Sequence, residues 1–368
     1  MVIWVEAKNP ALYSGGISIW LRSVVEILVN EQSQQVVLVG PDADKTSLKF
    51  GIDLKTLKVL WVHRLPRKIS HFLYNFVSFR LLANILRPKL IFSPYFDVDL
   101  PKSIPSIVTV HDLCFLEVPS LYSSLQVGYY TRALRKSLNQ ASYVVTVSES
   151  TKEAIATRDL FPLDKILVIG NYLGMEFLQH KPTSRSIIEL RHSFGNAPLI
   201  ILYTGGYENR KNLKNLVESL RILQGKSSDF SFVVTGQSEK AWERLIMIGD
   251  PLRNRTYFTG YLDQIQLKDL YTAADVVVYP SFSEGFGRAC IESMSVGTPL
   301  ACSDIPAFRE VASDYAEFFN PNNPSEIASS IMVASQSGRK KEIAQPDSPS
   351  DKEIKDFLEI VRLASSQG

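Results

Sequence analysis

The chain has 368 residues, a length that suits two domains of ordinary size. Its content of 45% hydrophobic and 21% charged residues is typical of a globular protein, and a net charge of +2 is too small to favour nucleic acid as a partner. Widely spaced cysteines in apolar contexts indicate reduced core residues, neither a disulfide framework nor a metal site. We find no secretory signal and no apolar run near the ~20 residues of a membrane span, so we expect a cytoplasmic protein.

Residues 2–40 predict the opening unit of a doubly wound α/β domain. A short apolar strand at 2–6 leads through a loop to Gly15 and Gly16, which open a helix that reaches residue 29, and a second strand follows at 36–40. This order of strand, glycine turn, helix and strand is that of a Rossmann-like domain. No G-x-G-x-x-G motif follows the first strand, so a dinucleotide dehydrogenase is disfavoured.

Residues 61–90 form the most basic and aromatic stretch of the chain. Basic side chains between His63 and His71 precede an aromatic and leucine-rich run. The pattern favours a core helix entered through a basic loop. An alternative stays open, in which the stretch touches anionic lipid head groups on the inner face of the membrane while its aromatic rings enter the interface.

The pairs Asp42 with Asp44 and Asp97 with Asp99 have the spacing of a short metal-binding motif. Both pairs lie among turn-forming residues, and matches of this length mostly arise by chance. We therefore predict no metal site and no metal cofactor.

A β-branched strand at 106–110 places His111 and Asp112 at its carboxyl end. Ligands of open α/β sheets bind outside the carboxyl ends of the strands, so His111 is a candidate site residue. Single histidines are more often structural, but here an adjacent acid can fix the tautomer of the imidazole. A further strand at 143–147 follows, and Ser148 is positioned to cap the next helix.

Residues 170–198 lack a long periodic pattern, and we place an interdomain linker near 172–180. A strand at 199–203 then ends at Gly205 and begins a second α/β domain. Near the end of the chain, residues 337–351 are polar and contain proline, which predicts a flexible segment before a final amphipathic helix.

Arg210 and Lys211 lie immediately before a predicted helix at 213–223. Adjacent cations at the start of a helix interact unfavourably with its dipole, which indicates that they face an anion. A guanidinium makes a bidentate contact with a phosphate, and an ammonium adds a point charge. We therefore predict that Arg210 and Lys211 bind a diphosphate.

Residues 276–299 predict a strand, a glycine loop and a helix. An apolar run at 276–279 ends at Pro280, and the segment that follows, as far as Gly287, is too rich in Ser and Gly for a strand. Residues 288–296 have helical composition, and Gly297 is placed to end the helix. A glycine turn before a helix offers free N–H groups and the positive end of the dipole to an anion.

Glu284 lies in this loop and Glu292 on the helix. A carboxylate only accepts hydrogen bonds, so it suits a vicinal diol. A nucleotide sugar carries hydroxyls on its sugar and on its ribose with a diphosphate between them, and one Glu at each end fits this ligand. A glycoside hydrolase that uses Glu284 and Glu292 stays an alternative, although it leaves Arg210 and Lys211 without a role.

The sequence EGFGRACIE at 284–292, with GTP at 297–299, resembles the signature of the family-4 retaining glycosyltransferases of the GT-B fold. In that family the first Glu contacts the donor hexose and the second grips the ribose, roles that the resemblance implies for Glu284 and Glu292. The loop amides of Gly285, Phe286 and Gly287 would then meet the sugar and the diphosphate.

Other stretches carry the same resemblance. The sequence VHDL at 110–113 is similar to the acceptor-domain motif, in which the His approaches the donor hexose. The resemblance also places Gly15 and Gly16 against the donor phosphates, and the backbone of Tyr261 and Leu262 beside the nucleobase.

The resemblance has one departure. Many family members carry an Arg directly after the glycine that ends the first strand of the second domain, where this chain has Gly206 after Gly205. Gly205 remains in the predicted donor site, but the positive charge on the phosphates would come from Arg210 and Lys211 alone.

The resemblance implies an α/β protein of the GT-B fold, with two Rossmann-like doubly wound domains facing across a cleft. We expect an acceptor-binding domain at 1–172 and a donor-binding domain at 173–350. The helix within 351–368 is expected to pack back on the N-terminal domain.

The function we expect is transfer of a hexose, with retention, from a nucleoside diphosphate sugar to a saccharide or lipid-linked acceptor in polysaccharide or glycoconjugate biosynthesis. UDP-glucose is preferred as the donor over UDP-GlcNAc, UDP-galactose and GDP-mannose, and the catalytic set is His111, Glu284, Arg210 and Lys211. Two alternatives stay open: a sugar-nucleotide epimerase of the same fold, and a non-catalytic nucleotide-sugar-binding subunit.

Overall fold

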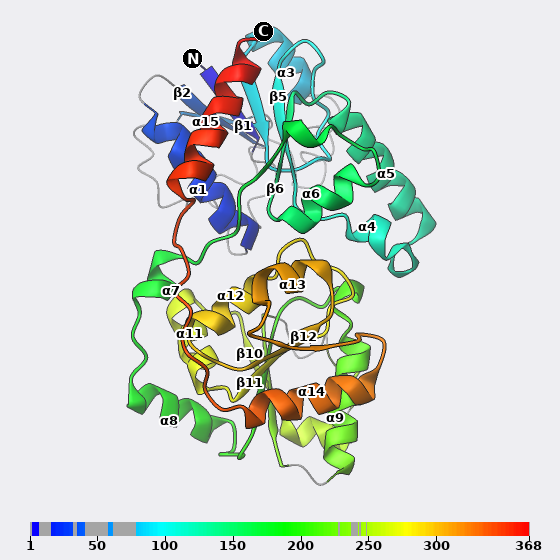
Figure 1. The fold of residues 1–368 in the computed structure, drawn as a ribbon, viewed down its shortest axis with the longest axis vertical. Helices are drawn as coiled ribbons and strands as arrows, with labels where there is room; N and C mark the ends of the chain where they lie inside the picture. Colours follow the sequence, from blue (N-terminus) through cyan, green and yellow to red (C-terminus); the bar gives the residue numbers. More distant parts are fainter. Residues whose placement is uncertain are drawn as a thin grey trace. The chain divides into compact units, whose positions relative to one another are not determined.

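The computed structural model describes residues 2–6, 16–31, 35–40, 58–61, 79–226, 229–236, 242, 244–247 and 249–367. The chain divides into two compact units, Met1–Tyr172 with Ser348–Gly368, and Leu173–Asp347 (Figure 1). Gly15, Asp42 and Asp44, and residues 62–78 of the basic and aromatic stretch, lie outside the described residues. The predictions that rest on them are therefore not addressed by the structure.

The N-terminal unit is built on a parallel sheet with seven described strands in the order β3-β2-β1-β4-β5-β6-β7. Their bounds are β1 (Val2–Glu6), β2 (Gln35–Gly40), β3 (Lys58–Trp61), β4 (Leu90–Ser93), β5 (Ser106–Val110), β6 (Tyr143–Thr146) and β7 (Ile166–Val168). The strand order reverses between β1 and β4, as in a doubly wound domain. Strands β4 and β5 are buried along their whole length, which explains their continuous apolar and β-branched composition.

The described helices of this unit are α1 (Gly16–Asn30), α3 (Phe79–Leu86), α4 (Cys114–Glu117), α5 (Ser124–Leu138), α6 (Glu149–Ala156) and α15 (Asp351–Ser365). Ser148 caps α6 by accepting a hydrogen bond from the Thr151 N–H at 3.1 Å, as the sequence predicts. Helix α5 begins with a capping box formed by Ser123 and Gln126.

The C-terminal helix α15 packs on the N-terminal sheet. Phe357 is fully buried, and its ring meets that of Phe92 on β4 edge-on, with 5.8 Å between centroids. Glu353 Oε1 accepts hydrogen bonds from the Tyr172 hydroxyl at 2.6 Å and from the Gly170 N–H at 3.2 Å. The end of the chain is therefore part of the core of the N-terminal unit, where Figure 1 shows α15 in red.

The C-terminal unit contains a second parallel sheet, with six described strands in the order β10-β9-β8-β11-β12-β13. Their bounds are β8 (Ile200–Thr204), β9 (Ser231–Thr235), β10 (Thr256–Gly260), β11 (Val276–Tyr279), β12 (Leu300–Ser303) and β13 (Glu317–Phe319). This order is that of a Rossmann sheet, and it reverses between β8 and β11. Two clusters of buried apolar side chains pack on this sheet, so the unit has its own core.

The described helices of the C-terminal unit are α7 (Met175–Gln179), α8 (Ser184–Ser193), α9 (Leu213–Gly225), α11 (Gln264–Ala273), α12 (Arg288–Ser295), α13 (Pro306–Ala312) and α14 (Pro324–Gln336). Helices α9 and α14 lie side by side (Figure 1). Short 3₁₀ helices at Asn209–Lys211 and Pro251–Arg255 complete the set.

The region around the expected linker contains regular structure that the sequence analysis did not predict. Helix α8 begins at a capping box made by Thr183 and Ser186. Arg191 near its end donates from Nη1 to Asp275 Oδ1 at 3.0 Å and to the Ala273 carbonyl at 2.8 Å. Polar contacts therefore hold this helix on the C-terminal unit. None of its residues is fully buried, so its sequence shows only a weak apolar pattern.

Residues 339–343 are bound to the C-terminal unit, contrary to the flexible segment expected from their composition. The Lys340 N–H donates to the Gly297 carbonyl, and the Ile343 N–H to the Met294 carbonyl, each at 2.9 Å. Arg339 Nη1 donates to Thr298 Oγ1 at 2.7 Å. Backbone hydrogen bonds, with one arginine side chain, therefore attach this segment to the carboxyl end of α12.

The three cysteines are buried, and none of them forms a disulfide. Within the part of the chain that the structure describes, no helix is long and apolar enough to cross a membrane.

Candidate active site

The candidate site lies where the strand order of the C-terminal sheet reverses. Neighbouring strands β8 and β11 both end at this point, and ligands of such sheets bind at the carboxyl ends of the strands there. The 3₁₀ turn Asn209–Lys211 follows β8, and the loop at 280–287 follows β11. A backbone hydrogen bond of 2.8 Å from the Phe282 N–H to the Arg210 carbonyl joins the two segments.

Glu284 accepts hydrogen bonds from several side chains of this site. Its Oε2 accepts a hydrogen bond from Arg210 Nη1 at 2.6 Å, while its Oε1 accepts from Lys211 Nζ at 2.6 Å and from Ser281 Oγ at 2.7 Å. Burial alone would raise the pKa of Glu284, but the charges of Lys211 and Arg210, together with these hydrogen bonds, lower it to about 2. The carboxylate is therefore ionised at any physiological pH.

Arg210 and Lys211 are held in place before any ligand binds. Only 8% of Lys211 is exposed, and its ammonium lies 5.3 Å from the centre of the Tyr279 ring. Arg210 makes a second, longer ion pair with Glu208, at 3.4 Å. The sequence predicted that both cations face an anion, and in this structure that anion is Glu284.

Gly287 shapes the start of α12. Its φ of +114° is a conformation that an L-residue rarely adopts, and a Cβ there would lie 2.8 Å from Phe308 Cδ1. The other end of α12 is closed by Gly297 with φ of +72°, at the position that the sequence predicts for the end of this helix.

Gly205, at the end of β8, has a packing role. A Cβ at this position would lie 2.7 Å from the Tyr203 hydroxyl oxygen and 3.1 Å from that of Tyr279. The rings of these two tyrosines stack with 5.7 Å between centroids. Gly205 therefore leaves room for two phenols beneath the site, a function that the sequence analysis did not assign to it.

Glu292 on α12 is fixed by two donors. Arg288 Nε donates to its Oε1 at 2.8 Å, and the Tyr271 hydroxyl donates to its Oε2 at 2.7 Å. Burial, with the Glu292 charge next, raises the pKa of Tyr271 well above its usual value, so the phenol keeps its proton. Because that proton goes to Glu292, the Thr204 hydroxyl is the donor in its 2.6 Å contact with Tyr271.

Arg288 keeps unused donors beside Glu292. Its Nη1 and Nη2 are buried and have no hydrogen-bond partner among the described residues. Unpaired donors of a buried charged group cost free energy, so an oxygen-rich ligand that accepted from them would be stabilised. The sequence analysis did not single out Arg288.

Tyr261 and Leu262 follow β10 in the same unit. Tyr261 is 81% exposed, whereas Leu262 is partly buried against the core. Their placement beside a nucleobase stays a prediction.

His111 stands at the carboxyl end of β5 in the N-terminal unit, as expected. Its Nε2–H donates to the Pro94 carbonyl at 3.0 Å, and its ring meets that of Trp20 edge-on at 5.0 Å. Burial lowers the pKa of His111 to about 4, although Asp112 and the Pro94 carbonyl oppose the shift. The imidazole is therefore neutral near pH 7, with Nδ1 left as the acceptor.

The prediction that Asp112 fixes the tautomer of the His111 imidazole is wrong. Asp112 Oδ1 accepts a hydrogen bond from the Cys114 N–H at 3.1 Å, at the start of α4. The carbonyl of Pro94 takes the imidazole proton instead, and a backbone carbonyl leaves no sequence signal.

Other predicted positions are placed as follows. Gly16 is the first residue of α1. Asp99 Oδ1 pairs with Lys136 Nζ at 2.6 Å and with Arg80 Nη1 at 3.5 Å. In the described ranges, no group of three or more His, Cys, Asp or Glu side chains could hold a metal ion.

The sequence analysis missed the hydroxyl groups of the site. These belong to Thr204, Tyr271, Tyr279 and Ser281, which bond to one another, to backbone or to the two glutamates. The tyrosines lie within apolar patterns and are predicted there only as core residues. One signal could have identified Thr204 as a site residue. It is a polar residue at the carboxyl end of a strand, next to the point where the strand order reverses.

Two family models match the chain. The model described as "Glycosyltransferase Family 4" matches residues 14–173, and the one described as "Glycosyl transferases group 1" matches residues 186–345. Sucrose-phosphate synthase from Thermosynechococcus elongatus superposes with a TM-score of 0.71 at 17% identity, covering 100% of both chains. HepE of Anabaena, in a complex with UDP-glucose, superposes with a TM-score of 0.66 at 15% identity. The superposition covers 98% of this chain and 99% of the HepE chain.

Curated relatives agree with this class. O-antigen chain mannosyltransferase B of Escherichia coli is 27% identical over 245 residues, which are 65% of this chain and 63% of that protein. O-antigen chain mannosyltransferase RfbU of Salmonella typhimurium is also 27% identical, over 73% of this chain and 72% of its own. The fold is that of a GT-B glycosyltransferase. This chain belongs to family 4 of the glycosyltransferases.

Proposed function

We propose that the chain is a retaining hexosyltransferase whose donor, a nucleoside diphosphate sugar, binds in the unit Leu173–Asp347. The observation that carries this proposal is the placement of Arg210 and Lys211 on Glu284, where the strand order reverses. Adjacent fixed cations suit the two phosphates of a nucleoside diphosphate. The N–H groups at the start of α12 would add hydrogen bonds to the same anion.

Donor binding would exchange the partners of Glu284. The diphosphate takes Arg210 and Lys211, and the carboxylate oxygens that they release can accept hydrogen bonds from hydroxyls of the sugar. Before the donor binds, Lys211 and Arg210 hold the pKa of Glu284 at about 2, so this side chain enters the exchange ionised, as an acceptor and not as an acid. Glu292 would accept from the ribose hydroxyls while the free Nη atoms of Arg288 donate to ligand oxygens.

Chemistry would follow a front-face path. The leaving diphosphate oxygen takes the proton of the acceptor hydroxyl, and Arg210, Lys211 and the loop amides stabilise its developing charge. The family resemblance assigns His111 to the donor hexose, and a neutral imidazole would suit a sugar that becomes positive, because it adds no repulsion and keeps Nδ1 as an acceptor. In this proposal, no step requires a metal ion.

The same geometry disfavours a glycoside hydrolase. Such an enzyme needs one carboxylic acid with a raised pKa to protonate the leaving group. Glu284 has the opposite shift, and Glu292 already accepts hydrogen bonds from Arg288 and Tyr271.

Two donors are proposed for testing. UDP-glucose is the donor preferred from the sequence, and it is bound in the HepE structure. GDP-mannose enters because two relatives are named as mannosyltransferases of O-antigen chains. The acceptor would accordingly be a saccharide, free or linked to a lipid, used in polysaccharide synthesis at the inner face of the membrane.

A thermal-shift screen of the full chain tests the nucleotide site. We expect UDP or GDP and the matching nucleotide sugar to raise the melting temperature, because a ligand that binds only the folded state stabilises it by mass action. The corresponding nucleoside alone should give a much smaller rise, because it lacks the diphosphate. No rise with any nucleoside diphosphate or nucleotide sugar would overturn the proposal.

Turnover on the donor that stabilises the protein tests the reaction itself. Proton NMR of the product identifies the anomer, and retention is expected. Isolation of an epimerised nucleotide sugar, with no transfer, would instead establish the epimerase. Chelation by EDTA should leave the rate unchanged.

A further inference from the structure

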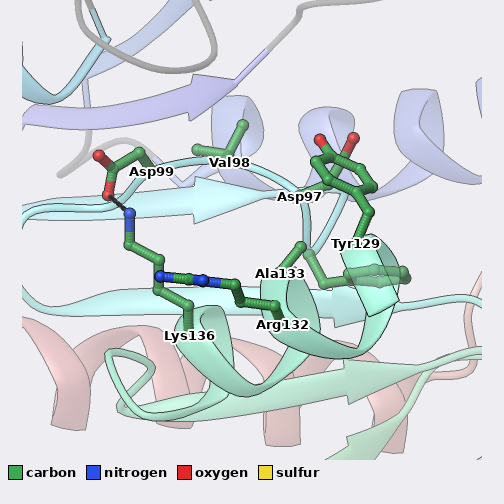
Figure 2. Close-up of a pocket in the computed structure, with 8 residues that line it drawn as sticks. Asp97, Val98, Asp99, Tyr129, Arg132, Ala133 and Lys136 are labelled. Carbon is green, nitrogen blue, oxygen red and sulfur yellow. Dashed lines mark ion pairs between the residues drawn. The ribbon is translucent and has the colours of Figure 1, made fainter. Parts of the chain in front are cut away.

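The N-terminal unit contains a cavity that has no role in the proposed donor site. It has a volume of about 180 Å³ and lies between α5 and the segment that follows β4 (Figure 2). Its lining consists of Phe96, Asp97, Val98, Asp99, Tyr129, Arg132, Ala133 and Lys136. Pockets for drug-sized ligands have volumes of roughly 300–1,000 Å³, so this cavity suits one ring and not a long chain.

The segment that lines the cavity starts next to a residue that contacts His111. Strands β4 and β5 are neighbours in the sheet, and His111 follows β5 directly. The ring of Tyr95, just after β4, lies 6.2 Å from that of His111, and the next residue along the chain, Phe96, lines the cavity. Because residues advance by at most ~3.6 Å each, Asp97 lies within about 7 Å of Tyr95 along the backbone.

The cavity offers acceptors and donors of both charges. Asp97 and Asp99 are acceptor-only groups when ionised, whereas Arg132 and Lys136 are donor-only groups. An anionic ligand would be repelled by the two carboxylates, and a cationic ligand by Arg132 and Lys136. A neutral ligand rich in hydroxyls can use both kinds of group, because each hydroxyl donates and accepts.

The two cations differ in how free they are to bind a ligand. Lys136 is committed to Asp99 at 2.6 Å, the contact drawn as a dashed line in Figure 2. Arg132, one helical turn earlier, makes no ion pair with any described residue. Its guanidinium is therefore the available donor.

The apolar part of the lining suits the carbon face of a sugar ring. Tyr129 lies on α5 one turn before Arg132 and Ala133, and the residue is 42% exposed. An aromatic ring with a polar end packs on the CH groups of a sugar while its hydroxyl reaches the rim. Phe96 and Val98 add apolar side chains to the lining.

We propose that this cavity binds one sugar residue of the saccharide acceptor, with Arg132 donating to its hydroxyls, Asp97 accepting from them and Tyr129 packing on the ring. The Lys136–Asp99 pair forms the fixed end of the site. This inference rests on the proposed glycosyltransferase function and assigns the acceptor subsite to residues outside the stretches that carry the family resemblance. It makes Arg132 and Tyr129 determinants of acceptor affinity and leaves the donor site untouched.

Saturation-transfer NMR with the full chain tests the site, using methyl α-D-mannopyranoside and methyl α-D-glucopyranoside as probes. We expect at least one glycoside to bind the wild type at millimolar concentration. Arg132→Ala and Tyr129→Ala should each weaken this binding by about tenfold, the effect of losing one hydrogen bond to a charged group or one ring contact. The control Arg135→Ala removes an exposed cation from the same helix outside the cavity and should leave binding unchanged.

Each outcome is decisive. Failure of both glycosides to bind the wild type, or equal binding by the wild type and both cavity variants, overturns the acceptor subsite. Competition of the glycoside by inorganic phosphate would identify an anion site and overturn the proposal as well. The nucleotide-induced thermal shift is measured on the same variants and should not change; its absence in the wild type would refute the donor site, whatever the glycosides show.

Discussion

At the scale of single residues, Glu284 balances the charge of two mostly buried cations. Glu284→Gln keeps the shape of the side chain and removes the charge that pairs with Arg210 and Lys211. Breaking a buried ion pair by neutralising one partner costs roughly 3–5 kcal/mol, because the remaining charges stay buried. We expect urea denaturation at pH 7 to show a loss of unfolding free energy of this size.

Acid should remove this difference. The pKa of Glu284 is lowered from 4.5 to about 2, so its contribution is fully present above pH 4.5 and is lost as the pH falls towards 2. The wild type and the variant should therefore converge over that interval. Glu208→Gln is the matched control. The Glu208 side chain is 59% exposed, so its ion pair with Arg210 contributes only about 0–1 kcal/mol to the free energy of unfolding. Equal losses in both variants would contradict the assigned charge balance.

His111 makes a second prediction at the scale of residues. Its pKa of about 4 keeps the imidazole neutral, with the proton on Nε2, because that nitrogen donates to the Pro94 carbonyl. We expect ¹⁵N NMR to show one neutral tautomer at pH 7 and no titration of His111 between about pH 5 and pH 8. In urea the same residue should titrate near pH 6.5.

The lowered pKa of His111 makes the stability of the protein depend on pH. Between pH 6.5 and about 4 the unfolded chain binds the His111 proton and the folded chain does not, so this residue lowers stability as the pH falls through that range. A His111 resonance that titrates near 6.5 in the folded protein would show that the imidazole is hydrated, and the neutral role proposed for it in catalysis would fail.

At the scale of elements, the glycine loop before α12 depends on one backbone conformation. Gly287→Ala should destabilise the protein, because φ of +114° strains an L-residue and the new Cβ would lie 2.8 Å from Phe308 and 3.3 Å from Cys290 Sγ. Strain of this kind costs about 1–3 kcal/mol. The loss of unfolding free energy should be accompanied by weaker nucleotide binding, because the loop amides move.

A control lies in the same unit. Gly225 is the last residue of α9, and a Cβ there meets nothing within 4 Å. Gly225→Ala should be neutral or stabilise the protein by about 0.5–1 kcal/mol. If Gly287→Ala proved as harmless as this control, the loop would be free to adopt another conformation.

The elements that sequence patterns predict best are the buried strands and the capped helices. The strand at 106–110, the strand at 276–279 and the cap at Ser148 are placed as expected, because an apolar run and a capping side chain are local signals. Helix α8 was missed because none of its residues is fully buried, so its sequence lacks a strong apolar period. Residues 339–343 were misread for a related reason, since backbone hydrogen bonds to α12 leave no mark in composition.

At the scale of the whole molecule, the sequence was sufficient for the GT-B fold and for the family, both of which are confirmed. Arg210, Lys211, Glu284 and Glu292 could be predicted as candidate site residues because they stand beside predicted strand and helix ends, whereas Arg288 was not singled out. Their pairing could not be predicted, because contacts such as Lys211 with Glu284 join segments that only the sheet order brings together. The neutral state of His111 also depends on burial, which comes from Trp20 and other distant residues.

Two compact units with separate cores predict two unfolding transitions. The core of the N-terminal unit includes α15 from the far end of the chain, so the first and last segments should melt together. Phe357→Ala removes a fully buried ring that packs on Phe92, a change that costs roughly 3–5 kcal/mol. In calorimetry we expect it to lower the midpoint of one transition only.

Nucleotide should act on the other transition. A ligand held by Arg210, Lys211 and Glu292 stabilises the unit Leu173–Asp347, so UDP or GDP should raise the midpoint of the transition that Phe357→Ala leaves unchanged. The two perturbations then assign each transition to one unit of the intact chain. A single transition that responds to both would show that the units unfold cooperatively, and their description as separate folding units would have to be abandoned.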